Sequence, residues 1–291
     1  MGNIIRAITS DGSITVCAID STQIAAKAEH YHRTSAVVTA ALGRLLTAAS
    51  LMGCQMKNEK SSITLKINGG GPADSIIAVS DFGGNVKGYA VNPIVEIPLN
   101  AKGKLDVSGA VGSDGILYVM RDFGTGEPYI GQSKLVSGEI AEDITNYYAQ
   151  SEQIPTVCAL GVLVDTDLTV KKAGGFLLQL LPGATDAVIE QIEENIKNLK
   201  PVTEMLSDGM TTQQICQKML NGFEMEILDT FDAVYKCDCS RDRVEKALSS
   251  LSRDELLSLP DEKGHARVEC HFCNKIHRFN KQELRAIADN Q

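Results

Sequence analysis

The stretches Cys237-Asp238-Cys239 and Cys270-His271-Phe272-Cys273 gather four of the chain's 8 cysteines near its C-terminal end, with residues 240–269 between them. Thiolates in two close pairs can converge on one tetrahedral ion, and structural zinc sites commonly hold four cysteine sulfurs at about 2.3 Å from the metal. Two pairs are a more specific pattern than a lone Cys-x-x-Cys. The sequence therefore predicts one Zn²⁺ per chain, held by Cys237, Cys239, Cys270 and Cys273.

The segment around these cysteines, residues 232–291, is short for an independent core, and domains of this size commonly need a metal or a disulfide. It is electrically neutral, with 11 acidic and 11 basic residues. Four cysteines already fill a tetrahedral shell, so we expect the three nearby histidines to lie outside it: His265, His271 and His277. We interpret residues 232–291 as a small C-terminal zinc-binding domain.

The close spacing of the cysteines also predicts redox chemistry. A Cys-x-Cys disulfide closes a very small ring and should be strained and readily reduced. Zinc keeps its ligands as thiolates, which oxidants attack once the metal loosens. Oxidation of both pairs would eject the metal, and apparent zinc-binding energies on the order of 10–16 kcal/mol are largely folding energy in small domains. We therefore expect an oxidised domain to unfold, together with any segment that depends on it.

Upstream of this domain, residues 184–231 read as an acidic helical linker. Ala187, Val188, Ile192, Ile196 and Leu199 are spaced for one face of a helix that ends before a proline, Pro201. Nine acidic residues against three basic ones give this segment 3 − 9 = −6 of the chain's formal charge of −9. We expect a solvated segment without a large core of its own.

The first 183 residues predict an N-terminal α+β domain of mainly antiparallel sheets with packed helices. Asp11-Gly12 and other glycine-containing turns separate short apolar runs, as in hairpins. The expected strands are residues 4–8, 13–18, 62–67, 75–79, 85–91, 116–121, 157–164 and 176–181. Helices are expected from residue 37, after possible caps at Thr34 and Ser35, and from Gly138 to about Gln150.

Composition limits the possible binding partners and the cellular compartment of the protein. A formal charge of −9, with 0 Trp, disfavours a nucleic-acid or anionic-lipid surface. No apolar run near the start fits a signal peptide, and none reaches the ~20 residues of a membrane helix. We therefore expect a cytoplasmic protein. The isolated cysteines are expected to be small buried hydrophobes: Cys17, Cys54, Cys158 and Cys216.

Distinctive motifs occur along nearly the whole chain. The C-terminal ones are Cys237-Asp-Cys239-Ser-Arg-Asp-Arg243 and Cys270-His-Phe-Cys273. The others are Thr39-Ala-Ala-Leu-Gly-Arg-Leu-Leu-Thr47, Gly70-Gly-Pro72, Asp114-Gly115, Ser137-Gly-Glu-Ile-Ala-Glu-Asp143, Ser151-Glu-Gln-Ile-Pro155, Ala173-Gly-Gly175 and Gln179-Leu-Leu-Pro-Gly183. Together these motifs resemble the heat-shock protein 33 family of redox-regulated chaperonins, which implies that residues 1–183 form a client-binding core.

This resemblance implies an ATP-independent holdase, not an enzyme, that protects against oxidative stress and aggregation. It implies that the reduced, zinc-bound protein is inactive. Oxidation would then form the disulfides Cys237–Cys239 and Cys270–Cys273, release zinc and melt the linker. The exposed apolar surface would bind unfolded client proteins, commonly as a homodimer.

Two other functions remain open from the residues alone. A zinc-dependent nucleic-acid-binding regulator would need a basic face, whereas residues 232–291 are neutral. A thiol-disulfide oxidoreductase would place Cys-x-x-Cys at a helix start in a parallel-sheet fold. Here the following Asn274-Lys-Ile-His-Arg278 reads as a turn entering a short strand.

Overall fold

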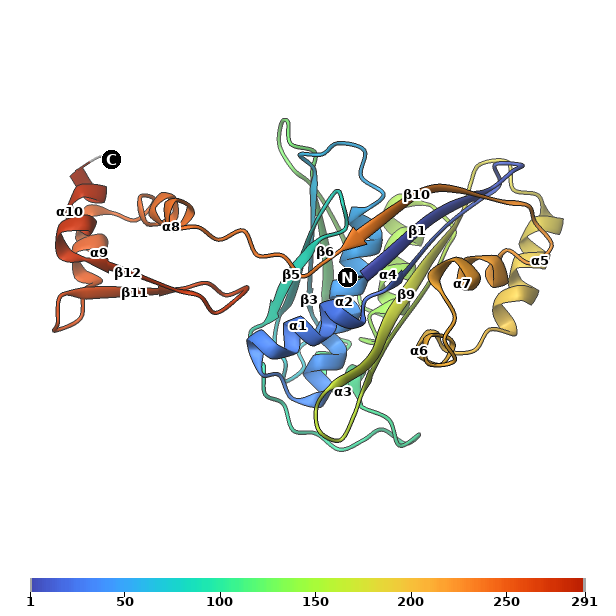
Figure 1. The fold of residues 1–291 in the computed structure, drawn as a ribbon, viewed down its shortest axis with the longest axis horizontal. Coiled ribbons are helices and arrows are strands. Elements are labelled where there is room, and N and C mark those ends of the chain that lie inside the picture. Colours follow the sequence, from blue (N-terminus) through green and yellow to red (C-terminus); the bar gives the residue numbers. More distant parts are fainter. Residues whose placement is uncertain (1, 290–291) are drawn as a thin grey trace. The chain divides into compact units, whose positions relative to one another are not determined.

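The computed structural model describes residues 2–289. The chain divides into two compact units, the first extending to Lys236 and the second beginning at Cys237. Strands and helices are mixed in both units, and the strands pair antiparallel (Figure 1). The predicted α+β class is confirmed. The predicted start of the last domain, residue 232, lies inside a strand of the first unit instead.

The first sheet of the N-terminal unit has the strand order β10-β1-β2-β9-β8. Its strands are β1 (Gly2–Thr9), β2 (Ile14–Asp20), β8 (Thr156–Val164), β9 (Val170–Leu180) and β10 (Met225–Ala233). The β1–β2 hairpin confirms the predicted turn: Gly12 has φ +70°, and the Asp11 carboxylate accepts the backbone N–H of Ser13 at 3.0 Å. Aspartate and glycine are common at such turns because both tolerate tight backbone geometry.

The second sheet of this unit has the order β5-β4-β3-β6-β7. Its strands are β3 (Ser62–Asn68), β4 (Ile76–Asp81), β5 (Val86–Ala90), β6 (Ile116–Asp122) and β7 (Tyr129–Lys134). Alternate residues of β3 are fully buried, namely Ile63, Leu65 and Ile67, as the period of two requires for a sheet with one covered face. The sequence predicted these strands except β7.

Helix α2 (Ala36–Gly53) forms the centre of the N-terminal unit, since it contacts strands of both sheets. Sixteen of its 18 residues are buried. Within the part of the chain that the structure describes, it is the one helix long and apolar enough to cross a membrane, but 89% of that stretch is buried inside the protein. The apolar run therefore serves the core. Ser35 precedes it as predicted, but its hydroxyl accepts the Val95 amide at 3.0 Å and does not cap the helix.

Three shorter helical elements complete this core. Helix α1 (Thr22–His32) packs on α2, and α3 (Val107–Val111) contacts α2 as well. Helix α4 (Ala141–Tyr147) continues into a π-helical turn, η1 (Tyr148–Glu152). The predicted start of this helix at Gly138 is wrong by three residues, because Gly138 has φ +73° and Ile140 has φ +72°. Helical residues need negative φ, so α4 begins only at Ala141.

The segment predicted as a solvated helical linker is packed against the first sheet. Helices α5 (Asp186–Lys197), α6 (Val202–Ser207) and α7 (Thr212–Met219) lie on the face of that sheet opposite α2 (Figure 1). Met205 and Cys216 on these helices are fully buried in one apolar cluster with Ile14 and Val16 of β2. The helical prediction is therefore confirmed for most of residues 186–219, but the expectation that this segment has no large core is wrong.

The end of the same segment is a strand rather than a helix. Strand β10 pairs antiparallel with β1 from Gly2↔Ala233 to Thr9↔Met225 and forms an edge of the first sheet. A β-bulge interrupts the pairing between Arg6 and Ala7. The helical expectation for residues 225–231 is wrong because pairing with the N-terminal strand supplies their hydrogen bonds.

The C-terminal unit combines helices with one hairpin. Its elements are α8 (Arg241–Leu248), α9 (Arg253–Ser258), β11 (His265–Glu269), β12 (Ile276–Asn280) and α10 (Lys281–Asp289). Its core is small: the buried apolar side chains are Leu248, Leu256, Ala266, Phe279, Leu284 and Ala288. Such a core gives limited stability on its own, so this unit depends on an additional cross-link.

Candidate metal centre

The four clustered cysteines come from two connections of the C-terminal unit. Cys237 and Cys239 lie in the extended segment before α8, which begins directly after Ser240. The Ser240 hydroxyl caps that helix by accepting the Arg243 amide at 3.2 Å, so the helix start fixes the segment at its downstream end. Cys270 and Cys273 lie in the turn between β11 and β12.

Backbone hydrogen bonds shape the turn that carries Cys270 and Cys273. The Cys270 amide donates to the Lys275 carbonyl at 3.0 Å, closing the base of the hairpin. The Cys270 carbonyl accepts the amides of Cys273 at 3.3 Å and of Asn274 at 2.8 Å. Asn274 has φ +57°, a conformation that asparagine tolerates better than most residues. The turn thus holds two cysteines in a fixed relation, in a loop and not on a helix.

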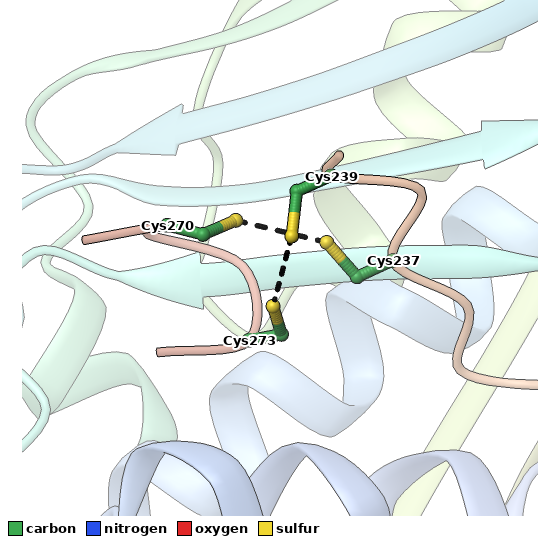
Figure 2. Close-up of side chains that lie close together, drawn as sticks. All are labelled: Cys237, Cys239, Cys270 and Cys273. Carbon is green, nitrogen blue, oxygen red and sulfur yellow. Dashed lines mark hydrogen bonds between the residues drawn. The ribbon is translucent and has the colours of Figure 1, made fainter. Parts of the chain in front are cut away.

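All four sulfurs converge on one point. Figure 2 shows the side chains of both pairs directed toward a common centre. The four Sγ atoms lie within 4.8 Å of one another, with Cys237–Cys270 at 3.7 Å and Cys239–Cys273 at 3.4 Å. A tetrahedron with metal–sulfur bonds of about 2.3 Å has sulfurs about 3.8 Å apart. The donor set and the spacing therefore fit a tetrahedral ion that prefers thiolates.

The protonation of these thiols follows their surroundings. Burial raises the pKa of Cys237 and of Cys239. Burial also opposes ionisation of Cys270, but hydrogen bonds from the backbone of Phe272, the Cys237 side chain and the backbone of Cys273 outweigh it and lower its pKa below 9.0. A bound cation would favour the ionised form of all four, because thiolates and not thiols ligate metal.

Charged and polar neighbours surround the cluster without joining it. The Arg243 guanidinium forms an ion pair with Asp238, the residue between the first two cysteines. The three histidines considered above are not in the four-cysteine group. His277 is 6% exposed on β12, whereas His265 is exposed at the start of β11. Four thiolates around a divalent ion carry net negative charge, so a nearby guanidinium stabilises the site.

The isolated cysteines are confirmed as mainly buried residues. Cys17, Cys54 and Cys216 are buried and Cys158 is half-buried, and all of them are free thiols. No local sequence pattern connects any two of them. The structure, however, places Cys17 Sγ and Cys54 Sγ 3.2 Å apart in the core of the N-terminal unit.

Comparisons with known proteins point to one family along nearly the whole chain. The family model described as "Hsp33 protein" matches residues 2–280. A protein of Agathobacter rectalis named 33 kDa chaperonin is 48% identical over 284 residues, covering 98% of each chain. Another of that name from Clostridium beijerinckii is 43% identical over 287 residues, covering 99% of this chain and 98% of the relative.

A solved structure gives the same result for the fold. The crystal structure of the 33 kDa chaperonin, or heat shock protein 33 homolog, of Thermotoga maritima superposes with a TM-score of 0.91 at 36% identity. The match covers 99% of this chain and 98% of that one. These relatives are named as chaperonins, which supports a chaperone and not an enzyme. Sequence, fold and cysteine cluster together show that this chain belongs to the Hsp33 family.

Proposed function

We propose that this protein is a redox-regulated, ATP-independent chaperone that binds unfolded client proteins after oxidation. The convergence of four sulfurs, in a chain that matches the Hsp33 family over its full length, is the observation that carries the proposal. The reduced cluster holds one Zn²⁺ through Cys237, Cys239, Cys270 and Cys273. Zinc suits this donor set because it accepts four thiolates tetrahedrally and has no redox chemistry of its own.

Oxidation opens the metal centre. In the proposed reaction, Cys237 bonds to Cys239 and Cys270 bonds to Cys273, so each pair of thiolates loses two electrons to the oxidant. A disulfide sulfur no longer carries the negative charge that binds zinc, so the ion leaves. The C-terminal unit then keeps only its small apolar core and unfolds.

The sequence of elements provides a route from the metal centre to the N-terminal unit. Cys237 directly follows Lys236, whose amide donates to the Val86 carbonyl at 2.8 Å. Just upstream, β10 forms the edge of the first sheet. When residues beyond Lys236 lose their structure, β10 loses its downstream anchor. Loosening of β10 and of helices α5–α7 would uncover the apolar face that Ile14, Val16 and neighbouring side chains form, and exposed apolar patches of this kind bind other chains.

Several finer properties belong to the same proposal. The oxidised protein acts as a homodimer, it works in the cytoplasm, where thiols are normally reduced, and it binds neither nucleic acid nor membrane. The formal charge of −9 supports the last point, because like charges repel phosphate-rich surfaces. The oxidoreductase alternative is not favoured, since the Cys-x-x-Cys lies in a turn between two antiparallel strands.

One sample treated with peroxide tests the proposal. Elemental analysis and a count of the four cluster thiols by peptide mapping, before and after oxidation, should show one zinc lost for every four of these thiols consumed. Light scattering of a thermally unfolding client should fall only with the oxidised sample, and a dithiol reductant plus zinc should reverse the effect. Cys158→Ser provides the control, because it removes a cysteine outside the cluster. Retention of zinc by a fully active oxidised protein would refute the mechanism.

A further inference from the structure

The N-terminal unit contains a second pair of adjacent thiols, separate from the metal centre. Cys17 lies in the middle of β2, and Cys54 directly follows the last residue of α2. Their Sγ atoms are 3.2 Å apart, closer than the Cys237–Cys270 and Cys239–Cys273 contacts of the metal centre. Both belong to the apolar core between the sheets, with exposures of 2% and 0%. Neither has a role in metal binding.

We propose that Cys17 and Cys54 form a second redox pair, which a small two-electron oxidant such as hydrogen peroxide converts to a disulfide. One thiolate attacks the peroxide O–O bond, which breaks to give a sulfenic acid and water. The second thiol attacks that sulfenic sulfur, the S–S bond forms and a second water leaves. Two thiols and one peroxide thus become one disulfide and two waters. The inference does not depend on the proposed chaperone activity.

The geometry requires only a small movement. A disulfide needs sulfurs about 2.05 Å apart, so the two Sγ atoms must approach by about 1.2 Å. Cys54 is well placed to move, because it sits at the C-terminal end of α2 and residues 57–60 beyond it are exposed. Its thiol is within 3.3 Å of the Leu51 carbonyl, one weak hydrogen bond that the rearrangement would break.

A cavity adjoins one member of the pair, Cys17, and offers a small oxidant a route to it. It has a volume of about 130 Å³ and is lined by Cys17, Gln55, Arg6 and Leu228, among others. A water molecule takes about 30 Å³ in the liquid, so there is room for peroxide. Leu228 is the β10 residue left unpaired by the bulge, since Arg6 pairs with Asp229 and Ala7 pairs with Ile227. Bulges disrupt the ladder, so the wall of the cavity is weakest there.

Charge and burial determine how fast the thiols of this pair are oxidised. Burial raises the pKa of Cys17, the neighbouring Cys54 raises it further, and the more distant Arg6 charge lowers it. Since only the thiolate is nucleophilic, the buried Cys17 should react more slowly than the half-buried cysteines of the metal centre after zinc has left. The product would tie β2 to the end of α2 and close a long loop, which stabilises the folded state by restricting the unfolded one. The N-terminal unit would thus be reinforced when oxidant is abundant.

Peptide mapping of the full chain tests the inference. The reduced, zinc-loaded protein is treated with hydrogen peroxide, quenched in acid, alkylated and digested with trypsin without reduction. Cys17 falls in the peptide of residues 7–27 and Cys54 in that of residues 45–57. We expect these two peptides to become linked by a disulfide. The link should form later than the oxidation of the peptides that carry the metal-centre cysteines. Cys54→Ala should abolish the link, and the wild-type map decides the question even if that variant does not fold.

Two results would overturn the inference. One is oxidation of the metal-centre peptides while the Cys17 and Cys54 peptides remain fully alkylated. The other is irreversible oxidation of Cys17 without any link to Cys54. Because both sets of cysteines are read from one digest, failure of this pair is distinguishable from failure of the proposed function.

A charge variant tests the route of access. Arg6 Nη1 and Asp229 Oδ2 form an ion pair at 2.7 Å that joins β1 to β10 beside the bulge. Asp229→Asn should speed formation of the Cys17–Cys54 link several-fold, because it loosens β10 and leaves the Arg6 charge free to favour the thiolate. Asp165→Asn is the matched control, since it removes a similar ion pair with Lys171 elsewhere. Equal rates in both variants and the wild type would exclude access through this cavity.

Discussion

The Sγ atoms of Cys239 and Cys273 lie 3.4 Å apart, a contact between the two cysteine pairs and not within one. Cys237 and Cys270 make the equivalent contact at 3.7 Å. All four Sγ atoms lie within 4.8 Å of one another, as tetrahedral coordination requires. The proposed disulfides join neighbours in the sequence, so they do not follow these two contacts across the pairs.

The choice between disulfides within each pair and disulfides across the pairs gives the first prediction. Trypsin releases Cys237 with Cys239 in the peptide of residues 237–241, and Cys270 with Cys273 in that of residues 268–275. If each pair forms its own disulfide, mass spectrometry without reduction will show two separate peptides, each lighter by two hydrogen atoms. Disulfides across the pairs would instead give one linked species, and its dominance would contradict the proposed pairing.

Removal of the metal should unfold the C-terminal unit while the centre of the N-terminal unit, α2 and β3, stays folded. Apparent zinc-binding energies on the order of 10–16 kcal/mol exceed what the few buried side chains of this unit can supply. A strong chelator added to reduced protein should therefore abolish amide protection in α8–α10, while β3 and α2 remain protected in hydrogen exchange. The matched variant is Cys273→Ser, which should show the same loss without chelator. Unchanged protection in α10 would show that the unit folds without metal.

The sequence predicted local features better than distant contacts. Asp11 and Gly12 define their turn by their own backbone preferences, so the β1–β2 hairpin could be predicted from them. The four clustered cysteines were identifiable because one ion restricts both residue type and spacing. Strand β10, by contrast, forms because residues 225–233 pair with β1 at the other end of the chain. Nothing local in an acidic segment indicates that partner.

The same limit applies to the buried face of α5–α7 and to the second thiol pair. Ile192 and Ile196 predicted an amphipathic helix, but not the sheet that covers its apolar face. Cys17 and Cys54 each fit the pattern of a small buried hydrophobe. Their contact depends on how β2 packs against the end of α2, which periodicity does not reveal.

Phe279 should slow metal release although it is not one of the four proposed ligands. It is fully buried in the C-terminal core, and the Arg241 guanidinium lies 4.3 Å from its ring centroid. Phe279→Ala should destabilise the unit by about 3–5 kcal/mol through lost burial and a cavity. Zinc release to a chromogenic chelator should become faster, whereas Phe279→Leu should have a smaller effect. Equal release rates in both variants and the wild type would contradict this dependence.

Acid should destabilise the N-terminal hairpin through Asp11. Hydrogen bonds from the Thr9 hydroxyl, the Ser13 hydroxyl and the Ser13 amide lower the pKa of Asp11 below its ordinary 3.8. The folded state thus favours the ionised carboxylate, and this stabilisation is complete above the unfolded pKa and is lost as pH falls through the folded one. Denaturant titrations from pH 6 down to about pH 2 should show a smaller acid-dependent loss for Asp11→Asn than for the wild type. Parallel curves of stability against pH would show that Asp11 contributes nothing to the loss of stability in acid.

Tyr235 should set the threshold for activation, because it holds the chain just before the metal centre. Its hydroxyl donates to the Gly88 carbonyl at 2.8 Å and accepts the Gly88 amide at 3.2 Å. His32 Nε2 lies 3.2 Å from the same oxygen. Tyr235→Phe leaves the buried amide and carbonyl of Gly88 without the hydroxyl, at a cost of about 1–3 kcal/mol. Since the ring itself is retained, packing should change little.

The measurement is the peroxide dose that gives half-maximal suppression of client aggregation. A weaker anchor at Tyr235 should release β10 sooner after zinc loss, so the dose should fall and zinc content in the reduced state should stay the same. Tyr129→Phe is the matched control, because that side chain is 48% exposed on β7. If Tyr235→Phe needs the same dose as the wild type, the segment before Cys237 does not transmit the opening of the metal centre to the first sheet.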